Sequence, residues 1–195
     1  MVCGAILAGG QARRMGGRDK SQLIVDGHTI LERQVAALGP CVDRLLLVGG
    51  AGAAHRPAGL EVVPDRSAGC GPLGGLDAAL AAAAGEPVLL LACDMPFVTA
   101  PFLAFLSDRL GAADAVVPRT ERGYHPLCAV YAASCLTAVR RRLEARQLRL
   151  RDLLGDLQVH VIEESELAQF GEPSHLLANV NTEADLDALE SLRNH

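Results

Sequence analysis

The chain has 195 residues, a length that fits one domain able to bury a full core and to build a sheet with helices on it. Half of the residues are hydrophobic but only 3% are aromatic, so the core must be built from aliphatic side chains. The formal net charge of -5 argues against a general nucleic-acid-binding protein, whose surface would be basic.

The six cysteines are scattered along the chain and include no C-x-x-C pair. Zinc-ligand spacing is therefore absent, and a disulfide framework is not expected at this length. Cys93 is expected to be a buried thiol. Residues 1–4 lack the basic region of a signal peptide, and no apolar run approaches the length of a membrane span. We therefore predict a soluble, reduced, cytoplasmic protein that binds neither nucleic acid nor membranes.

Strand and helix patterns alternate along the first half of the chain. The apolar run over 2–8 predicts a buried strand that stops at Gly9-Gly10. Thr29-Ile30-Leu31-Glu32 has the spacing of a capping box and predicts the start of a helix that ends at Gly39-Pro40. Further predicted elements are a strand over 45–48, a strand over 60–63 and a helix over 71–84.

The second half continues the alternation. Residues 88–92 predict a buried strand, followed by a helix over 101–110 and extended segments over 115–117, 129–131 and 159–162. Ser134 is expected to cap a helix that runs to Arg146, and Thr182 to open a terminal helix with an acidic first turn. The whole chain, 1–195, is thus predicted to be a single α/β domain with three layers. Its Rossmann-like central sheet would be mostly parallel, with helices on both faces.

In such sheets, ligands bind beyond the carboxyl ends of the strands. Three segments qualify by that rule, namely 9–20, 65–75 and 93–96. All three leave the same edge of the sheet if their strands are parallel. We therefore expect one site built from these segments.

The first of these segments combines glycines with basic side chains. Lys20 is the only lysine among the 18 lysine and arginine residues. Its compact ammonium suits a phosphate that is approached closely and then released, whereas guanidinium is a wide planar fork. The glycines would let main-chain N–H groups approach anionic oxygens. The segment matches neither the P-loop nor the dinucleotide fingerprint, and a flexible basic surface loop is the alternative interpretation.

Asp94 lies at the end of the predicted strand over 88–92. An ionised carboxylate there is a hard oxygen ligand, suited to Mg²⁺ held jointly with substrate phosphates. The alternative is that Asp94 caps the following helix, a role for which Thr99 competes. Asp65 occupies an equivalent strand end, where a turn residue after Pro64 is the simpler interpretation.

Other polar and glycine-rich strings are weaker signals. The glycines of 71–75 could leave a slot for a flat base or simply form a tight helix entry. Asn179 and Asn181 would share one side of an extended segment, because alternate residues share a face. His125 precedes a strand and lies either in a ligand-facing loop or at an ordinary surface position.

Taken together, these strings resemble those of the molybdenum cofactor guanylyltransferases, which share the broader sugar-nucleotide-transferase-like fold. The resemblance spans nearly the whole chain, and the combination is more specific than any single string. The strings, in order, are Leu7-Ala8-Gly9-Gly10, Arg13-Arg14-Met15-Gly16, Asp19-Lys20, Gly71-Pro72-Leu73, Cys93-Asp94-Met95-Pro96, His125-Pro126-Leu127 and Asn179-Val180-Asn181-Thr182.

The resemblance implies a nucleotidyltransferase that moves GMP from GTP to a molybdopterin phosphate and releases pyrophosphate. It implies Mg²⁺ on Asp94, catalytic roles for Lys20, Asp94 and Arg14, and transient contact with proteins that deliver or accept the cofactor. Asn179, Asn181 and Arg149 are candidates for the pterin side. The candidates for the nucleotide are Leu7, Ala8, Gly9, Gly10, Lys20, Asp65, Gly71, Gly75 and Asp94.

One departure from the resemblance matters. Some relatives have a nucleotide-contacting asparagine after the second strand, whereas Val48-Gly49-Gly50 offers only main-chain groups here. Any contact with the nucleotide at that point must therefore use the main chain.

Three alternatives remain open. The first is a cytidylyltransferase acting on the same pterin, although such relatives tend to have Ala-Ala-Gly and Pro-Lys at 7–10 and 19–20. The second is a phospholactate or sugar nucleotidyltransferase. The third is a non-catalytic nucleotide-sensing module, in which a damaged phosphate loop or metal carboxylate would be expected; both are intact in this sequence.

Overall fold

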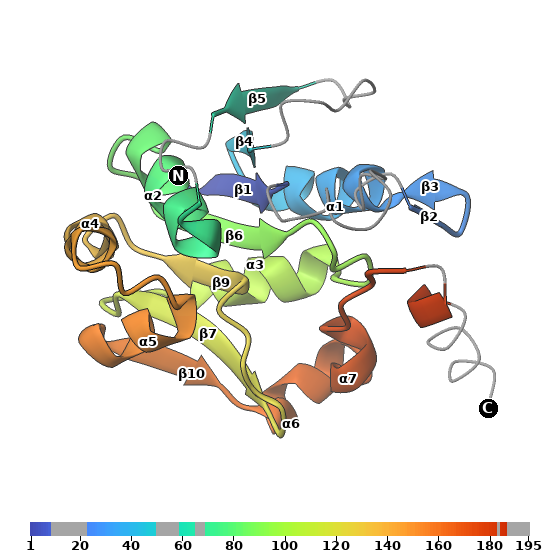
Figure 1. Cartoon of the computed structure of the whole chain (residues 1–195). Helices are drawn as coiled ribbons and strands as arrows, with labels where there is room; N and C mark the ends of the chain where they lie inside the picture. Colours follow the sequence, from blue (N-terminus) through green and yellow to red (C-terminus); the bar gives the residue numbers. More distant parts are fainter. Residues whose placement is uncertain (9–22, 50–58, 65–68, 183, 187–195) are drawn as a thin grey trace.

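The computed structural model describes residues 1–8, 23–49, 59–64, 69–182 and 184–186. Within these residues a central sheet runs in the order β10-β7-β9-β6-β1-β4-β5, with β8 paired to β7 (Figure 1). A separate two-stranded hairpin is formed by β2 (Ile24–Val25) and β3 (His28–Thr29). The strands of the central sheet are β1 (Cys3–Leu7), β4 (Arg44–Val48), β5 (Leu60–Val63), β6 (Val88–Ala92), β7 (Ala115–Thr120), β8 (Gly123–Tyr124), β9 (Cys128–Tyr131) and β10 (Val159–Ile162).

Helices cover both faces of this sheet, so the predicted three-layer architecture is confirmed. One face packs against α2 and α4, which contact each other, and the other face packs against α1 and α3 (Figure 1). The α-helices are α1 (Ile30–Leu38), α2 (Gly71–Ala82), α3 (Ala100–Asp108), α4 (Cys135–Glu144), α5 (Leu150–Leu153), α6 (Glu164–Leu167) and α7 (Pro173–Leu176). Short 3-10 helices are η3 (Gly39–Cys41), η4 (Leu154–Asp156) and η5 (Ala168–Phe170).

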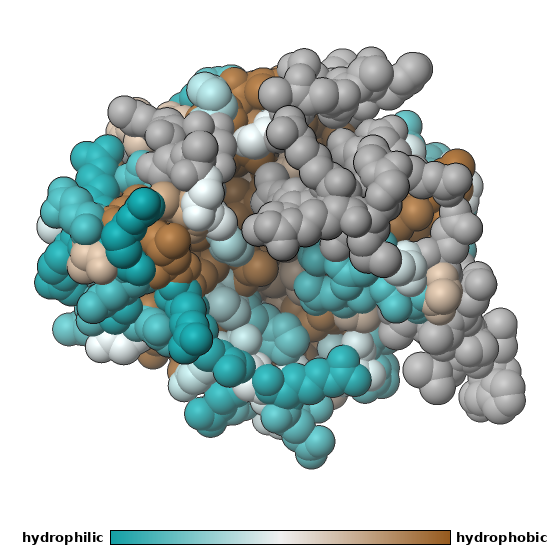
Figure 2. All heavy atoms as spheres, viewed as in Figure 1, coloured by the Kyte–Doolittle hydropathy of each residue, from teal (hydrophilic) through white to brown (hydrophobic). Residues whose placement is uncertain are grey.

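The two faces arise from the period-2 alternation of each strand. In β1, Ala5 and Leu7 pack into the core beneath α2 and α4, whereas Ile6 packs into the core beneath α1 and α3. Both cores are almost entirely aliphatic, as the composition predicts. Figure 2 shows mostly hydrophilic side chains over α4 and α5, with hydrophobic residues exposed elsewhere on the same face.

Strand direction agrees with the predicted, mostly parallel sheet. β1 pairs in parallel with β4 and β6, β4 with β5, and β7 with β10. β9 is antiparallel to both β6 and β7. The reversal brings the start of β9 to the edge where the parallel strands end, because Cys128 lies opposite Leu91.

Two of the three predicted N-terminal helix caps, those at Thr29 and Thr182, are confirmed by their hydrogen bonds. Thr29 Oγ1 accepts a hydrogen bond from the N–H of Glu32 (3.2 Å), and Glu32 Oε2 accepts one from the N–H of Thr29 (2.8 Å). At the C-terminus, Thr182 Oγ1 accepts from the N–H of Asp185 (3.1 Å), whose Oδ2 accepts from the N–H of Thr182 (3.0 Å). Both are reciprocal caps of the kind that satisfies main-chain donors at a helix start.

The prediction for Ser134 is wrong. Its backbone is already helical, with φ -56° and ψ -27°, and its side chain makes no capping hydrogen bond. Ser134 Oγ instead donates to Asp114 Oδ1 at 2.8 Å, and a helical backbone does not give the extended conformation from which an N-cap oxygen accepts from the first turn. The helix also ends at Glu144 rather than at Arg146, whose φ of 57° is incompatible with a continuing helix.

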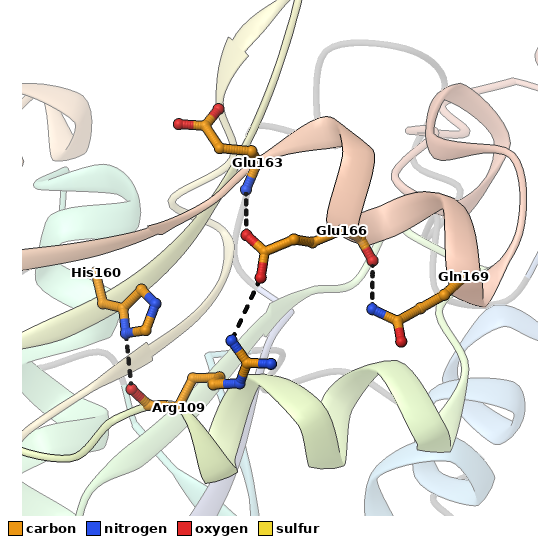
Figure 3. Close-up of polar contacts among 5 residues, drawn as sticks. All are labelled: Arg109, His160, Glu163, Glu166 and Gln169. Atoms are coloured by element: carbon orange, nitrogen blue, oxygen red, sulfur yellow. Dashed lines mark hydrogen bonds and ion pairs between the residues drawn. The ribbon is translucent and has the colours of Figure 1, made fainter.

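Polar contacts join the end of α3 to β10, the edge strand of the sheet, and to α6 (Figure 3). Arg109, directly after α3, places Nη1 3.3 Å from Glu166 Oε1 and its carbonyl oxygen 3.1 Å from His160 Nδ1. Glu166 also accepts from the N–H of Glu163 at 3.2 Å, and its carbonyl accepts from Gln169 Nε2 at 2.7 Å. Exposed pairs of this kind contribute up to about 1 kcal/mol each. Together they tie α6 to α3 and orient the chain that leads to α7.

No helix within the described ranges is long and apolar enough to cross a membrane. All six cysteines fall within those ranges, and none of them forms a disulfide. Cys93 is half-buried, not buried as predicted, because it lies in the turn that follows β6.

Candidate active site

The carboxyl ends of four strands meet at one edge of the sheet. Leu7, the last residue of β1, lies opposite Val48 of β4 and Ala92 of β6. Pairing continues past the strand ends, since Ala8 N donates to Val48 O (2.9 Å) and Cys93 N donates to Leu7 O (3.1 Å). The chain after β1 and the turn after β6 therefore start side by side. This is the edge at which parallel α/β sheets bind ligands.

Asp94 is held at this edge by Asn179, which is 85 positions further along the chain, and by the residue after it. Asn179 Nδ2 donates to Asp94 Oδ2 at 3.2 Å, and Val180 N donates to the carbonyl oxygen of Asp94 at 2.7 Å. Val180 is fully buried, whereas Asn179 and Asn181 are exposed, which is the predicted alternation. The structure thus brings Asp94 and Asn179 together, while Asn181 N donates to Asp185 Oδ2 at 2.9 Å.

Two side chains of α1 donate hydrogen bonds to the turn that follows β6 and contains Asp94. Neither of them was identified from the sequence. Gln34 Nε2 donates to Ala92 O (2.6 Å) and to Met95 O (3.1 Å), and Arg33 Nε donates to Pro96 O (3.1 Å). Gln34 lies on the buried face of α1, four residues after Ile30 and four before Leu38. A glutamine within an apolar helical stripe is the signal that could have identified it.

Gly75 has a packing role in the structure. It is buried in α2, and a Cβ added to it would lie 2.9 Å from Leu7 Cδ2 and 3.3 Å from Leu7 Cδ1. The missing side chain therefore lets α2 approach β1 closely. Gly71, by contrast, is exposed at the first position of α2, with a φ of 59° that favours glycine.

Gly75→Val is expected to destabilise the protein by about 1–3 kcal/mol, because the added methyl groups overpack the α2–β1 contact. Urea unfolding of the variant measures this loss. Leu7→Ala in the same chain should recover part of it, with a coupling of about 1 kcal/mol in a double-mutant cycle. Additive effects of the two substitutions would contradict the packing role.

His125 lines a surface cavity and is half-buried, so it is not an ordinary surface histidine. Its Nε2 lies 2.9 Å from Thr120 Oγ1. Burial lowers the pKa of His125, and the nearby Arg122 and Arg151 lower it further, so the ring is neutral near pH 7. The cavity lining also includes Glu172, whose pKa is lowered chiefly by the hydrogen bond from the Ser174 hydroxyl.

Two chain segments connect this cavity to the turn from Ala92 to Met95, which we call the Asp94 turn. On one side, Leu127 O, two residues after His125, accepts a hydrogen bond from Ala92 N at 2.9 Å. On the other, Leu177 lines the cavity two residues before Asn179. Arg149 is exposed directly before α5, and its neighbour Arg151 donates from Nη2 to Arg122 O at 3.4 Å. The cavity therefore lies on the β7–α7 side of the Asp94 turn.

Five of the predicted site residues, Gly9, Gly10, Arg14, Lys20 and Asp65, lie outside the described residues. The residues that flank segment 9–22 are described. Ala8 pairs with β4 at the carboxyl edge, and Leu23 O accepts a hydrogen bond from Ile30 N at 2.9 Å. Leu23 also packs in the small cluster that contains Val180. Both flanks of the segment that carries Lys20 thus lie near the Asp94 turn.

The donor set of this site fits Mg²⁺ bound together with a nucleotide. Asp94 supplies a carboxylate, and no group of three or more His, Cys, Asp or Glu residues that could hold a metal occurs in the described part of the chain. Mg²⁺ is commonly held by one or two carboxylates with waters and substrate phosphates, not by a protein-only cage. A single strand-end aspartate is therefore an adequate anchor.

Residues 4–161 match the model of the MobA-like NTP transferase domain. The chain belongs to the MobA-like NTP transferase family. Among its relatives is a protein of Pelotomaculum thermopropionicum named "Probable molybdenum cofactor guanylyltransferase", 35% identical over 183 residues, which are 94% of this chain and 89% of the relative. The crystal structure of molybdopterin-guanine dinucleotide biosynthesis protein A from Archaeoglobus fulgidus superposes with a TM-score of 0.80 at 26% identity, covering 98% of each chain.

A second solved structure bears on the alternatives within this MobA-like fold. The 2-C-methyl-D-erythritol 4-phosphate cytidylyltransferase of Thermus thermophilus superposes with a TM-score of 0.66 at 18% identity, covering 98% of each chain. At that identity the likeness shows the fold alone. The resemblance to guanylyltransferases is confirmed, and the cytidylyltransferase is a more distant neighbour.

Proposed function

We propose that this protein transfers GMP from GTP to the molybdenum–molybdopterin cofactor, forming its guanine dinucleotide form and pyrophosphate. The observation that carries the proposal is that Asn179 and Val180 both donate hydrogen bonds to Asp94. Asp94 lies next to the point where the chain leaves β1 at Ala8. Family membership supports nucleotidyl transfer as the reaction class. The names of the relatives support guanine as the base and a pterin as the acceptor.

On this proposal GTP lies along the carboxyl edge of the sheet. Leu7, Ala8 and the glycines at 9–10 offer main-chain groups to the nucleotide, and Lys20 and Arg14 neutralise its phosphates. Gly71 opens α2 at the same edge, and the first-turn N–H groups of a helix favour anionic or oxygen-rich ligands. Asp65 follows β5 and is the remaining candidate for the nucleotide.

The reaction is an in-line attack by the phosphate oxygen of the pterin on the α-phosphorus of GTP. A new P–O bond forms as the bond between the α-phosphorus and the bridging oxygen breaks, and pyrophosphate leaves with the electron pair. No general base is needed, because a phosphomonoester is already ionised near neutral pH. The main obstacle is repulsion between two anions, so catalysis consists of positioning and charge neutralisation. Lys20 balances the charge that grows on the leaving pyrophosphate.

Asp94 is the residue that would hold Mg²⁺, which when bound supplies charge stabilisation at the phosphate oxygens. Asn179 orients the carboxylate through its hydrogen bond to Oδ2. Half-burial of Asp94 limits the solvent that screens its charge. The side chain is thus presented in one orientation before the nucleotide arrives.

The acceptor is proposed to bind on the β7–α7 side. Asn179 and Asn181 are exposed there, and the cavity lined by His125 and Glu172 is adjacent. An ionised carboxylate such as Glu172 matches the paired N–H donors of an aminopyrimidinone ring. Arg149, two residues before the Arg151 side chain that reaches Arg122, is a candidate for the acceptor phosphate.

Equilibrium dialysis with GTP and CTP, each with and without Mg²⁺, tests this proposal first. We expect GTP to bind at least about tenfold more tightly than CTP, a difference of about 1.4 kcal/mol, and Mg²⁺ to strengthen it. A transfer assay with molybdenum-loaded molybdopterin follows. Preference for CTP would favour the cytidylyltransferase, and GTP binding without transfer would favour the nucleotide-sensing module.

Three further expectations remain predictions. They are the cytoplasmic location, the single nucleotidyltransferase domain over 1–195 and the transient contact with proteins that deliver or accept the cofactor. Fractionation, limited proteolysis and crosslinking, respectively, measure them.

A further inference from the structure

We propose that Gln34 is a positioning residue for the Asp94 carboxylate, acting through the main chain of the turn after β6. The inference rests on the function proposed above, because it concerns how that site holds its metal and nucleotide. Gln34 belongs to α1 and does not touch the substrate. It acts on the backbone from which Asp94 projects.

The hydrogen bonds of Gln34 bracket Asp94. Its single NH2 group donates to Ala92 O at 2.6 Å and to Met95 O at 3.1 Å, one carbonyl on each side of Cys93-Asp94. The main chain closes the same turn only weakly, since Met95 N donates to Ala92 O at 3.4 Å. The side chain of Gln34 therefore contributes the shorter contacts that define the turn.

The turn is held from a second direction. Val180 N donates to the carbonyl oxygen of Asp94 at 2.7 Å, from the segment after α7. Gln34 fixes the carbonyls on either side, and Val180 fixes the carbonyl of Asp94 itself. These three hydrogen bonds hold the carbonyls of Ala92, Asp94 and Met95, and they restrict the backbone from which the carboxylate projects. Such supporting contacts tune metal affinity even though they lie outside the ligand set.

The buried side chain of Gln34 is satisfied on its NH2 group but not on its carbonyl oxygen. Its side chain is 0% exposed, and its Oε1 has no hydrogen-bond partner within the described part of the chain. An unsatisfied buried carbonyl is unfavourable, and an apolar side chain of similar size would remove that cost but would leave Met95 O without this donor. What the apolar side chain lacks is the NH2 group that bridges Ala92 and Met95. Glutamine is therefore needed for the hydrogen bonds that set the geometry of the turn.

Gln34→Met, which keeps the volume and removes the donor, is the variant that tests this role. We expect Mn²⁺ binding in the presence of GTP, followed by electron paramagnetic resonance without any acceptor, to weaken by about 10- to 100-fold. GTP binding without metal should stay within about twofold of wild type. The midpoint of thermal unfolding should shift by only a few degrees, because the volume is conserved.

Leu38→Ala is the matched control. Leu38 is also fully buried on α1, one turn further along, and its apolar side chain cannot donate to the turn. The control should lower the unfolding midpoint more than Gln34→Met does, yet retain wild-type Mn²⁺ affinity. Wild-type Mn²⁺ affinity in Gln34→Met would overturn the positioning role, and so would equal weakening in Leu38→Ala. If the wild type binds Mn²⁺ with GTP but does not transfer GMP to the pterin, the proposed function fails and the role of Gln34 is still decided.

Discussion

Asp94→Ala is expected to abolish Mg²⁺-dependent nucleotidyl transfer, lowering kcat by roughly 100- to 1000-fold. The substitution removes the only proposed carboxylate ligand and the acceptor for Asn179 Nδ2. Without the carboxylate that would hold Mg²⁺, less positive charge offsets the repulsion between the two polyanions. Steady-state kinetics across a Mg²⁺ titration measures the loss.

Asp94→Asn separates charge from shape in this experiment. It keeps the size of the side chain and a partner for Asn179, so its stability should match the wild type within about 1 kcal/mol. Its activity should nevertheless fall almost as far as that of Asp94→Ala. Asp43→Asn is the control, because Asp43 accepts from Val2 N at 2.9 Å before the start of β4, at the opposite edge of the sheet. Mg²⁺-dependent activity retained in Asp94→Ala would remove the metal assignment.

Lys20→Arg is expected to lose about 90–99% of kcat while GTP binding stays measurable. Positive charge is preserved, so electrostatic attraction to the triphosphate persists. The planar guanidinium, however, cannot follow the leaving pyrophosphate as closely as a compact ammonium does. Single-turnover transfer compared with GTP binding by dialysis separates the two effects.

Arg44→Lys provides the reverse exchange at a site remote from the chemistry. Arg44 forms an exposed ion pair with Glu61, with 2.8 Å between Nη2 and Oε2, at the start of β4. We expect its activity to remain within about twofold of wild type, since exposed pairs contribute little. Full turnover by Lys20→Arg would show that the chemistry does not distinguish ammonium from guanidinium.

Local patterns predicted much of the fold because their physics is local. The capping box at Thr29 needs only four consecutive residues, and the reciprocal cap at Thr182 is equally short. Ser134 shows the limit of such reasoning. Whether its side chain caps α4 depends on its backbone conformation and on Asp114, which is 20 residues away and accepts a hydrogen bond from its hydroxyl.

The site was predictable in its parts but not in its assembly. Asp94 could be placed at a strand end from the apolar run that precedes it. Its contact with Asn179 spans 85 residues, and no local pattern indicates it. Gly75 could be placed on a helix, but the close approach of Leu7 that explains it requires the sheet and helix to be docked.

By itself, the sequence determined the order of the longer strands and helices, the aliphatic core and the loop chemistry expected at the carboxyl edge. These follow from side-chain periodicity, turn residues and charge, which act over a few neighbouring positions. Only the tertiary structure decided that β9 runs antiparallel, that Asn179 reaches Asp94 and that Gln34 braces the turn after β6. Such contacts join residues distant in sequence, and their geometry is set by how the helices and strands pack, which no local pattern encodes.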